Sequence, residues 1–230
     1  MKIYVEEAVF SLLPGFTLFC LEADLGPFCP GMKNPKCELE NAVESVKKRE
    51  KKEEGFPLFN PLEPWREAFK KFTSEKGSKS SLESLIEAAD LKALQGLGPM
   101  EEVEKAVSLY FSAPLSGVDL SKVNRFLGLC LSGGRDPFQD EKRESLTLEG
   151  EVCYMDRLGA VSRCINWKIS PRVKATEESR KILFLSEAVD KDSRMRTGEA
   201  VRDLDRRLQT YFGAKTRFFA LDEGQMSKRV

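Results

Sequence analysis

The 230-residue sequence predicts one mixed α+β domain, with helices prevailing in the first half and short strands in the second. Before Leu115, apolar residues recur at helical spacing in several segments. After it come short β-rich segments separated by turns. No internal repeat and no Pro/Ser-rich linker divides the chain, so we expect residues 1–230 to form a single domain.

In the first half, the 35–55 segment carries Leu39, Val43 and Val46 at helical spacing, which predicts a surface helix with one thin apolar stripe. The charged run 47–54 mixes acids with bases. It therefore indicates the solvated end of this helix more than a nucleic-acid contact. The other predicted elements are helices over 5–13, 65–72, 82–94 and after Pro99, and a strand over 16–22.

Two local patterns support these helices. Trp65, Phe69 and Phe72 form one aromatic face, which we interpret as core-facing, with base stacking as the alternative. Ser80 and Glu83 have the spacing of a capping box. In the second half, strands are predicted over 127–132, 152–155, 160–167 and 182–185, and a final helix over 198–212.

The chain has no histidine and six cysteines. The first fact excludes Ser-His-Asp triads, Cys-His dyads and histidine-ligated metals. No C-x-x-C pair occurs and most cysteines lie in apolar runs, so we interpret them as buried thiols, with a redox pair of Cys29 and Cys37 as the alternative.

No phosphate loop, dinucleotide-binding motif or metal-spaced carboxylate cluster is present, so the sequence predicts neither a cofactor nor a metal. No apolar segment approaches the roughly 18 residues of a membrane span. Near the start of the chain, Glu6 and Glu7 stand where a signal peptide would carry an apolar run. We therefore expect a cytoplasmic protein without a membrane partner.

Charge is balanced overall, with 37 basic and 37 acidic residues, but it is distributed unevenly. Residues 1–115 hold 15 bases and 19 acids, and residues 116–230 hold 22 bases and 18 acids. The stretch 157–175 contains five cations and no acid, around Asn166 and Trp167. It fits a surface for an anionic ligand, or a strand edge protected by charge.

The order of several segments resembles free-standing proteins built on the third and fourth modules of the bacterial phenylalanyl-tRNA synthetase beta chain, best over residues 5–212. The segments that carry the resemblance are Glu6-Glu7-Ala8-Val9-Phe10, Trp65-Arg66-Glu67-Ala68-Phe69, Pro114-Leu115-Ser116-Gly117-Val118-Asp119-Leu120, Gly150-Glu151-Val152-Cys153-Tyr154-Met155-Asp156, Arg163-Cys164-Ile165-Asn166-Trp167-Lys168 and Ala175-Thr176-Glu177-Glu178-Ser179. The resemblance implies a three-layer domain with a central mixed sheet flanked by helices. It also implies tRNA or aminoacyl-tRNA as the partner.

The synthetase module edits misacylated tRNA, and this sequence departs from its editing residues. Glu102 and Lys105 stand where the family has an Asp-x-x-Asn pair, and Ser116 stands where the synthetase has a histidine. The resemblance leaves eight candidates for a binding pocket and no assigned catalytic residue. They are Lys105, Ser116, Asp119, Glu151, Asp156, Arg163, Trp167 and Lys168.

Structural roles are equally open for two of these: Asp119 could cap the turn at Leu120-Ser121, and Glu151 could pair with an arginine. Three functions follow. The first is a non-catalytic protein that binds tRNA, another RNA or an aminoacyl-like ligand. The alternative is a trans-editing hydrolase of misacylated tRNA, and the third is an interaction protein unrelated to tRNA.

Overall fold

The computed structural model describes residues 1–27, 35–53, 60–88, 94, 96–141 and 143–230. It confirms the mixed α+β class. The helices are α1 (Glu7–Leu12), α2 (Pro35–Glu53), α3 (Glu63–Phe69), α4 (Ser81–Glu87), α5 (Pro99–Phe111) and α6 (Lys191–Phe212). The strands are β1 (Lys2–Val5), β2 (Thr17–Asp24), β3 (Ser116–Asp119), β4 (Phe126–Gly133), β5 (Pro137–Gln139), β6 (Glu144–Leu146), β7 (Glu149–Asp156), β8 (Gly159–Ala160), β9 (Ser162–Arg163), β10 (Lys168–Ile169), β11 (Lys181–Ala188), β12 (Lys215–Leu221) and β13 (Ser227–Arg229).

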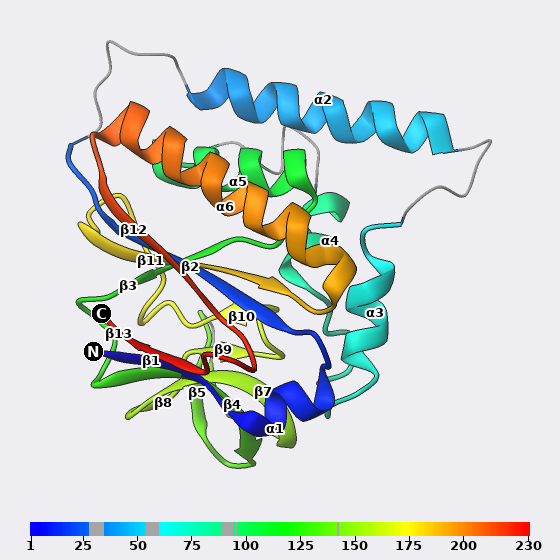
Figure 1. Cartoon of the computed structure of the whole chain (residues 1–230), viewed down its shortest axis with the longest axis vertical. Coiled ribbons are helices and arrows are strands. Elements are labelled where there is room, and N and C mark those ends of the chain that lie inside the picture. Colours follow the sequence, from blue (N-terminus) through cyan, green and yellow to red (C-terminus); the bar gives the residue numbers. More distant parts are fainter. Residues whose placement is uncertain (28–34, 54–59, 89–93, 95, 142) are drawn as a thin grey trace.

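Two large sheets lie one above the other, and the long helices cover the upper one (Figure 1). The lower sheet is mixed and has the order β13-β1-β4-β7-β8-β5-β6, with parallel pairing at β1–β4 and β5–β8. The upper sheet is antiparallel, with the order β12-β2-β11-β3. The short pair β9–β10 forms a separate ribbon.

Three apolar cores separate these layers. The first lies between the two sheets, where Ile3 and Leu127 of the lower sheet meet Leu18 and Leu185 of the upper one. The second lies between the upper sheet and the helices α5 and α6, and the third between α2 and the α4–α5 pair. Strands β2 and β11 alternate side chains between the first two cores, so both of their faces are buried.

The structure confirms the predicted buried faces of α2 and, in large part, α3. Leu39, Val43 and Val46 are buried on α2, as the stripe predicted. Trp65 and Phe72 are buried and Phe69 is half-buried, which confirms a core role for most of that aromatic face. Helix α6 begins before the predicted residue 198, because the Asp190 side chain accepts from the Ser193 amide at 2.8 Å and caps it at that point.

Two predicted elements differ from the structure in their bounds. The helix predicted from Val5 begins at Glu7, and Lys2–Val5 is a strand between β4 and β13. The strand predicted over 160–167 is divided into β8 and β9, and β9 ends at Arg163 because Cys164 and Ile165 adopt left-handed backbone angles, with φ of 45° and 61°. These angles turn the chain back into β10.

Cys20, Cys130, Cys153 and Cys164 are free and buried, as expected for internal thiols. The side chains of the alternative pair, Cys29 and Cys37, lie outside the described residues. None of the helices in the described part of the chain is long and apolar enough to cross a membrane.

The start of α4 provides a test of local stability. The Ser80 hydroxyl accepts from the Glu83 amide at 3.1 Å, whereas the Glu83 carboxylate pairs with Arg66. We expect Ser80→Ala to lower the free energy of unfolding by about 1 kcal/mol in urea titrations, because the helix loses its cap. Ser81→Ala is the matched control, since the Ser81 hydroxyl is buried without a described hydrogen bond. An equal loss in both variants would contradict the capping role.

Candidate functional site

The contacts of the described residues place the eight predicted pocket residues in three groups. Glu151, Arg163, Trp167 and Lys168 lie around β7, β9 and β10. Asp156 lies at the end of β7, beside the loop that follows β10. Lys105, Ser116 and Asp119 lie on α5 and β3, beside the upper sheet.

The centre of the first group is a buried ion pair. The Arg163 Nε donates to Glu151 Oε1 at 2.6 Å, and the two side chains are 4% and 0% exposed. The same oxygen accepts from the Cys164 amide at 3.0 Å, and Oε2 accepts from the Leu148 amide at 2.9 Å. The left-handed angle at Cys164 accompanies this contact, so the turn that broke the predicted strand places a backbone donor on Glu151.

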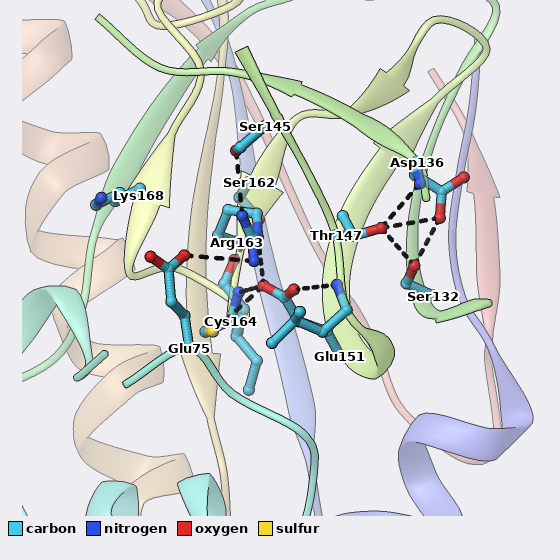
Figure 2. A network of polar contacts seen from close by, with 12 residues as sticks. Glu75, Ser132, Asp136, Ser145, Thr147, Glu151, Ser162, Arg163, Cys164 and Lys168 are labelled. Atoms are coloured by element: carbon cyan, nitrogen blue, oxygen red, sulfur yellow. Dashed lines mark hydrogen bonds and ion pairs between the residues drawn. The ribbon is translucent and has the colours of Figure 1, made fainter. Parts of the chain in front are cut away.

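Further groups complete the surroundings of Arg163 (Figure 2). Its guanidinium lies 3.5 Å from Glu75 Oε2, donates to Ser145 Oγ at 3.4 Å and stands over the Phe138 ring. The hairpin that carries Leu148 is held at its base by hydrogen bonds among Ser132, Asp136 and Thr147. The pair therefore joins the 73–80 loop, the hairpin, β7 and β9.

The electrostatics of this pair favour the charged form of both partners. Burial alone would raise the pKa of Glu151, but hydrogen bonds from Arg163 and the Leu148 amide hold it below the usual value. Burial likewise opposes the charge on Arg163, and Glu151 raises its pKa. A carboxylate held in this way is poorly suited to accept a proton from a substrate.

Trp167 and Lys168 are the members of the first group that reach the surface. Both are half-buried. The Lys168 ammonium lies 4.2 Å from the centre of the Trp167 ring and 3.3 Å from Asp140 Oδ2. This is a cation–aromatic pair whose charge is already balanced by a neighbouring carboxylate.

Asp156 and Asp119 hold backbone turns. Arg172 donates to both oxygens of Asp156, at 2.8 and 3.0 Å, and the amides of Asn124 and Leu158 also donate to it. Asp119 accepts from the amide and hydroxyl of Ser121 and from the Ser179 hydroxyl. Its role is thus the turn-capping alternative that the sequence left open. Burial opposes ionisation of Asp119, but these hydrogen bonds lower its pKa overall.

Lys105 lies on α5 and Ser116 on β3, and these two elements approach each other at Glu104 and Gly117. The Lys105 ammonium pairs with Glu104 at 2.7 Å, and a Cβ on Gly117 would lie 3.3 Å from the Glu104 carboxylate. Ser116 is 7% exposed on β3, opposite Leu185 of β11. These groups belong to α5 and the upper sheet, whereas Glu151 and Arg163 belong to the lower sheet and the ribbon beside it.

The acid-free stretch 157–175 receives its carboxylates from other segments. Four of its five cations form ion pairs with acids outside the stretch: Arg163 with Glu151 and Glu75, Lys168 with Asp140, Arg172 with Asp156, and Lys174 with Glu101. Only Arg157 has no ion pair among the described residues, and it is exposed. The local basic charge is therefore largely neutralised in the folded chain.

A second buried polar network was missed from the sequence. Glu187 of β11 is 1% exposed and accepts from the Tyr154 hydroxyl and the Asn166 amide, both at 2.7 Å. Burial raises the pKa of Glu187. The sequence offered one signal for this network. Glu187 lies just after the apolar 182–185 run, and a charge that faces a core needs polar partners. Glu75 and Asp140 had no comparable signal.

Among the described residues, no group of three or more acids or cysteines is placed to hold a metal ion. A hollow of about 350 Å³ lies beside α3 and α4, lined by Trp65, Arg66, Phe69, Gly77, Ser78, Lys79, Ser80, Glu83 and Glu87. None of the eight predicted pocket residues lines it.

Comparisons with known proteins give a likeness of structure and none of sequence. No family model and no curated protein matches the chain. A solved structure of an N-terminal fragment of the phenylalanyl-tRNA synthetase beta-subunit from Pyrococcus horikoshii is similar, with a TM-score of 0.47 and 9% identity. The match covers 96% of this chain and 54% of that fragment, so the chain spans about half of its length. This is a weak resemblance of fold and assigns no activity.

The buried pair makes a sharp stability prediction. We expect Arg163→Met to lower the free energy of unfolding by about 3–5 kcal/mol, because Glu151 is left charged and buried. Lys168→Met is the matched control and should cost less than about 1 kcal/mol, since its ion pair is partly exposed. Urea titrations at neutral pH measure both, and equal losses would contradict the account.

The same pair predicts a response to acid. The pKa of Glu151 is lower in the folded chain than its unfolded value of about 4.3, so the pair stabilises the fold fully above about pH 4.3. That contribution is lost as the pH falls through the lower folded-state pKa. In urea titrations from about pH 7 to pH 3, Arg163→Met should therefore lose less stability than the wild type. An identical acid loss would contradict this.

Proposed function

We propose that this chain is a non-catalytic RNA-binding protein whose ligand class is tRNA or aminoacyl-tRNA. The observation that carries the non-catalytic part is the engagement of the predicted pocket carboxylates. Glu151 is held by Arg163, Asp156 by Arg172, and Asp119 by Ser121 and Ser179. A general acid or base must exchange a proton with its substrate, and these groups serve the fold instead.

RNA as the partner is supported by charge and by the resemblance of the sequence segments. The second half of the chain carries 22 bases and 18 acids, and several of its exposed cations lie outside the ion pairs described above. In this proposal residues 1–230 act as one domain, which is supported by the pairing of β1 with β13 from opposite ends of the chain.

Binding and hydrolysis are separated by one experiment on the purified chain. Tyrosyl-tRNA and phenylalanyl-tRNA are incubated with it, and complex formation and ester loss are followed together. We expect a complex that weakens steeply between about 50 and 200 mM salt, because cations replace counterions on phosphate. We expect ester loss at the spontaneous rate. Faster loss would favour the trans-editing hydrolase, and the absence of any complex with RNA would contradict the proposal.

A further inference from the structure

The outer face of the lower sheet carries a feature that the predicted pocket does not include. On β1 and β4, Ile3 and Leu127 point into the core between the sheets. The alternate residues, Lys2, Tyr4 and Phe126, therefore occupy the opposite face. The register places Lys2 beside Phe126 on one side and beside Arg229 of β13 on the other.

Two aromatic rings lie together on this outer face. The Tyr4 and Phe126 ring centres are 5.9 Å apart, tilted by 45°, and both residues are half-buried. The Tyr4 ring lies across the backbone of β4 at Gly128, where a Cβ would approach its Cζ to 2.3 Å. The glycine thus permits the ring to lie close against the strand, and the Cys130 thiol donates to the Tyr4 hydroxyl at 3.5 Å.

The Tyr4 ring is also prepared for a charged ligand. The Lys2 ammonium lies 5.0 Å from the ring centre. The Tyr4 hydroxyl is neutral at physiological pH, as in any tyrosine, and burial raises its pKa further, so the ring does not repel phosphate. A cation over a neutral aromatic ring can neutralise a phosphate while the ring contacts a base.

Four exposed cations lie close to these rings in the sheet or along the chain: Lys2, Arg125, Arg157 and Arg229. Lys228 pairs with Ile3 and therefore lies on the other face. Arg125 directly precedes Phe126, and the Arg157 amide donates to the Asn124 carbonyl at 3.2 Å, which brings the end of β7 to the start of β4. None of the four takes part in the ion pairs of the described residues. This differs from the 157–175 stretch, where four of five cations are paired.

The outer face is also remote from the helical layers. In Figure 1, β1, β13 and β4 lie at the opposite end of the molecule from α2, α5 and α6. We propose that this face, formed by Tyr4, Phe126 and the four cations, binds a single-stranded segment of RNA. The inference rests on the proposed RNA-binding function and names the surface and the strand state of the ligand.

Single-stranded RNA fits this face better than a duplex. Aromatic side chains on a sheet can stack only on bases that are free of their helix, whereas a duplex presents phosphates and stacked, paired bases. Unpaired cations beside the rings would follow the backbone of the strand. A pair of rings of this size accommodates about two bases.

The test compares matched variants by fluorescence anisotropy with labelled oligo(U) and oligo(A) of about 12 nucleotides and with a duplex RNA. The outer-face variant is Lys2→Gln/Arg125→Gln/Arg157→Gln/Arg229→Gln. Its control removes the same number of exposed cations from the helix-covered half: Lys181→Gln/Lys191→Gln/Arg202→Gln/Lys215→Gln. Thermal unfolding checks that both variants fold.

We expect the outer-face variant to bind single-stranded RNA at least about tenfold more weakly than the wild type, with a smaller salt dependence, whereas the control stays close to the wild type. Tyr4→Leu should weaken binding about tenfold through lost stacking, and Tyr4→Phe should keep most of the affinity because the ring remains.

Three outcomes would overturn the inference. If the wild type binds RNA and the outer-face variant binds as tightly as the control, the surface is wrong and the RNA-binding function stands. A preference of the wild type for duplex RNA over both single strands would also refute a single-strand surface. If the wild type binds no RNA of any kind, both the surface and the proposed function fail. The outer-face charge variant still tests the surface if Tyr4→Leu fails to fold.

Discussion

The arrangement of the lower sheet depends on one constraint, that a charge removed from water must be paired. Glu151 and Arg163 are almost fully buried, and together they require partners from four places in the chain. The backbone turns left-handed at Cys164 where its amide meets this pair, and the 73–80 loop is held beside it through Glu75. A pair with this many supports specifies one arrangement of loop, hairpin and ribbon, whatever its net contribution to stability.

The pairing of charges in the fold also decides which cations are left to bind an anionic ligand. The cations clustered in residues 157–175 suggest a ligand surface, yet in the fold Lys168 pairs with Asp140 and Arg172 pairs with Asp156. Lys2 and Arg229, at opposite ends of the sequence, become neighbours through strand pairing and form no described ion pair. The surplus charge thus lies on a surface that no single segment of the sequence reveals.

Much of the fold could be predicted because burial leaves a periodic pattern. The apolar stripe of α2 and the continuous apolar runs of β2 and β11 identified these elements correctly. Strand β13 could not be found this way, since Ser227–Arg229 is exposed throughout and has no apolar alternation. The end of β9 at Cys164 accompanies a hydrogen bond from the Cys164 amide to Glu151, and the ion pairs of Glu75 and Asp140 also join residues far apart in the sequence. The same kind of long-range contact places the eight predicted pocket residues in three separate groups, which the sequence could not show.

A photochemical cross-link tests most directly which aromatic surface of the chain contacts RNA. A single-stranded oligonucleotide containing 4-thiouridine is bound to the wild-type chain and irradiated, and the modified peptide is identified by mass spectrometry. We predict cross-links to the peptides that contain Tyr4 and Phe126, on the outer face of the lower sheet. Cross-links confined to the peptide that contains Trp167 would contradict the account and return the ligand surface to the 157–175 stretch.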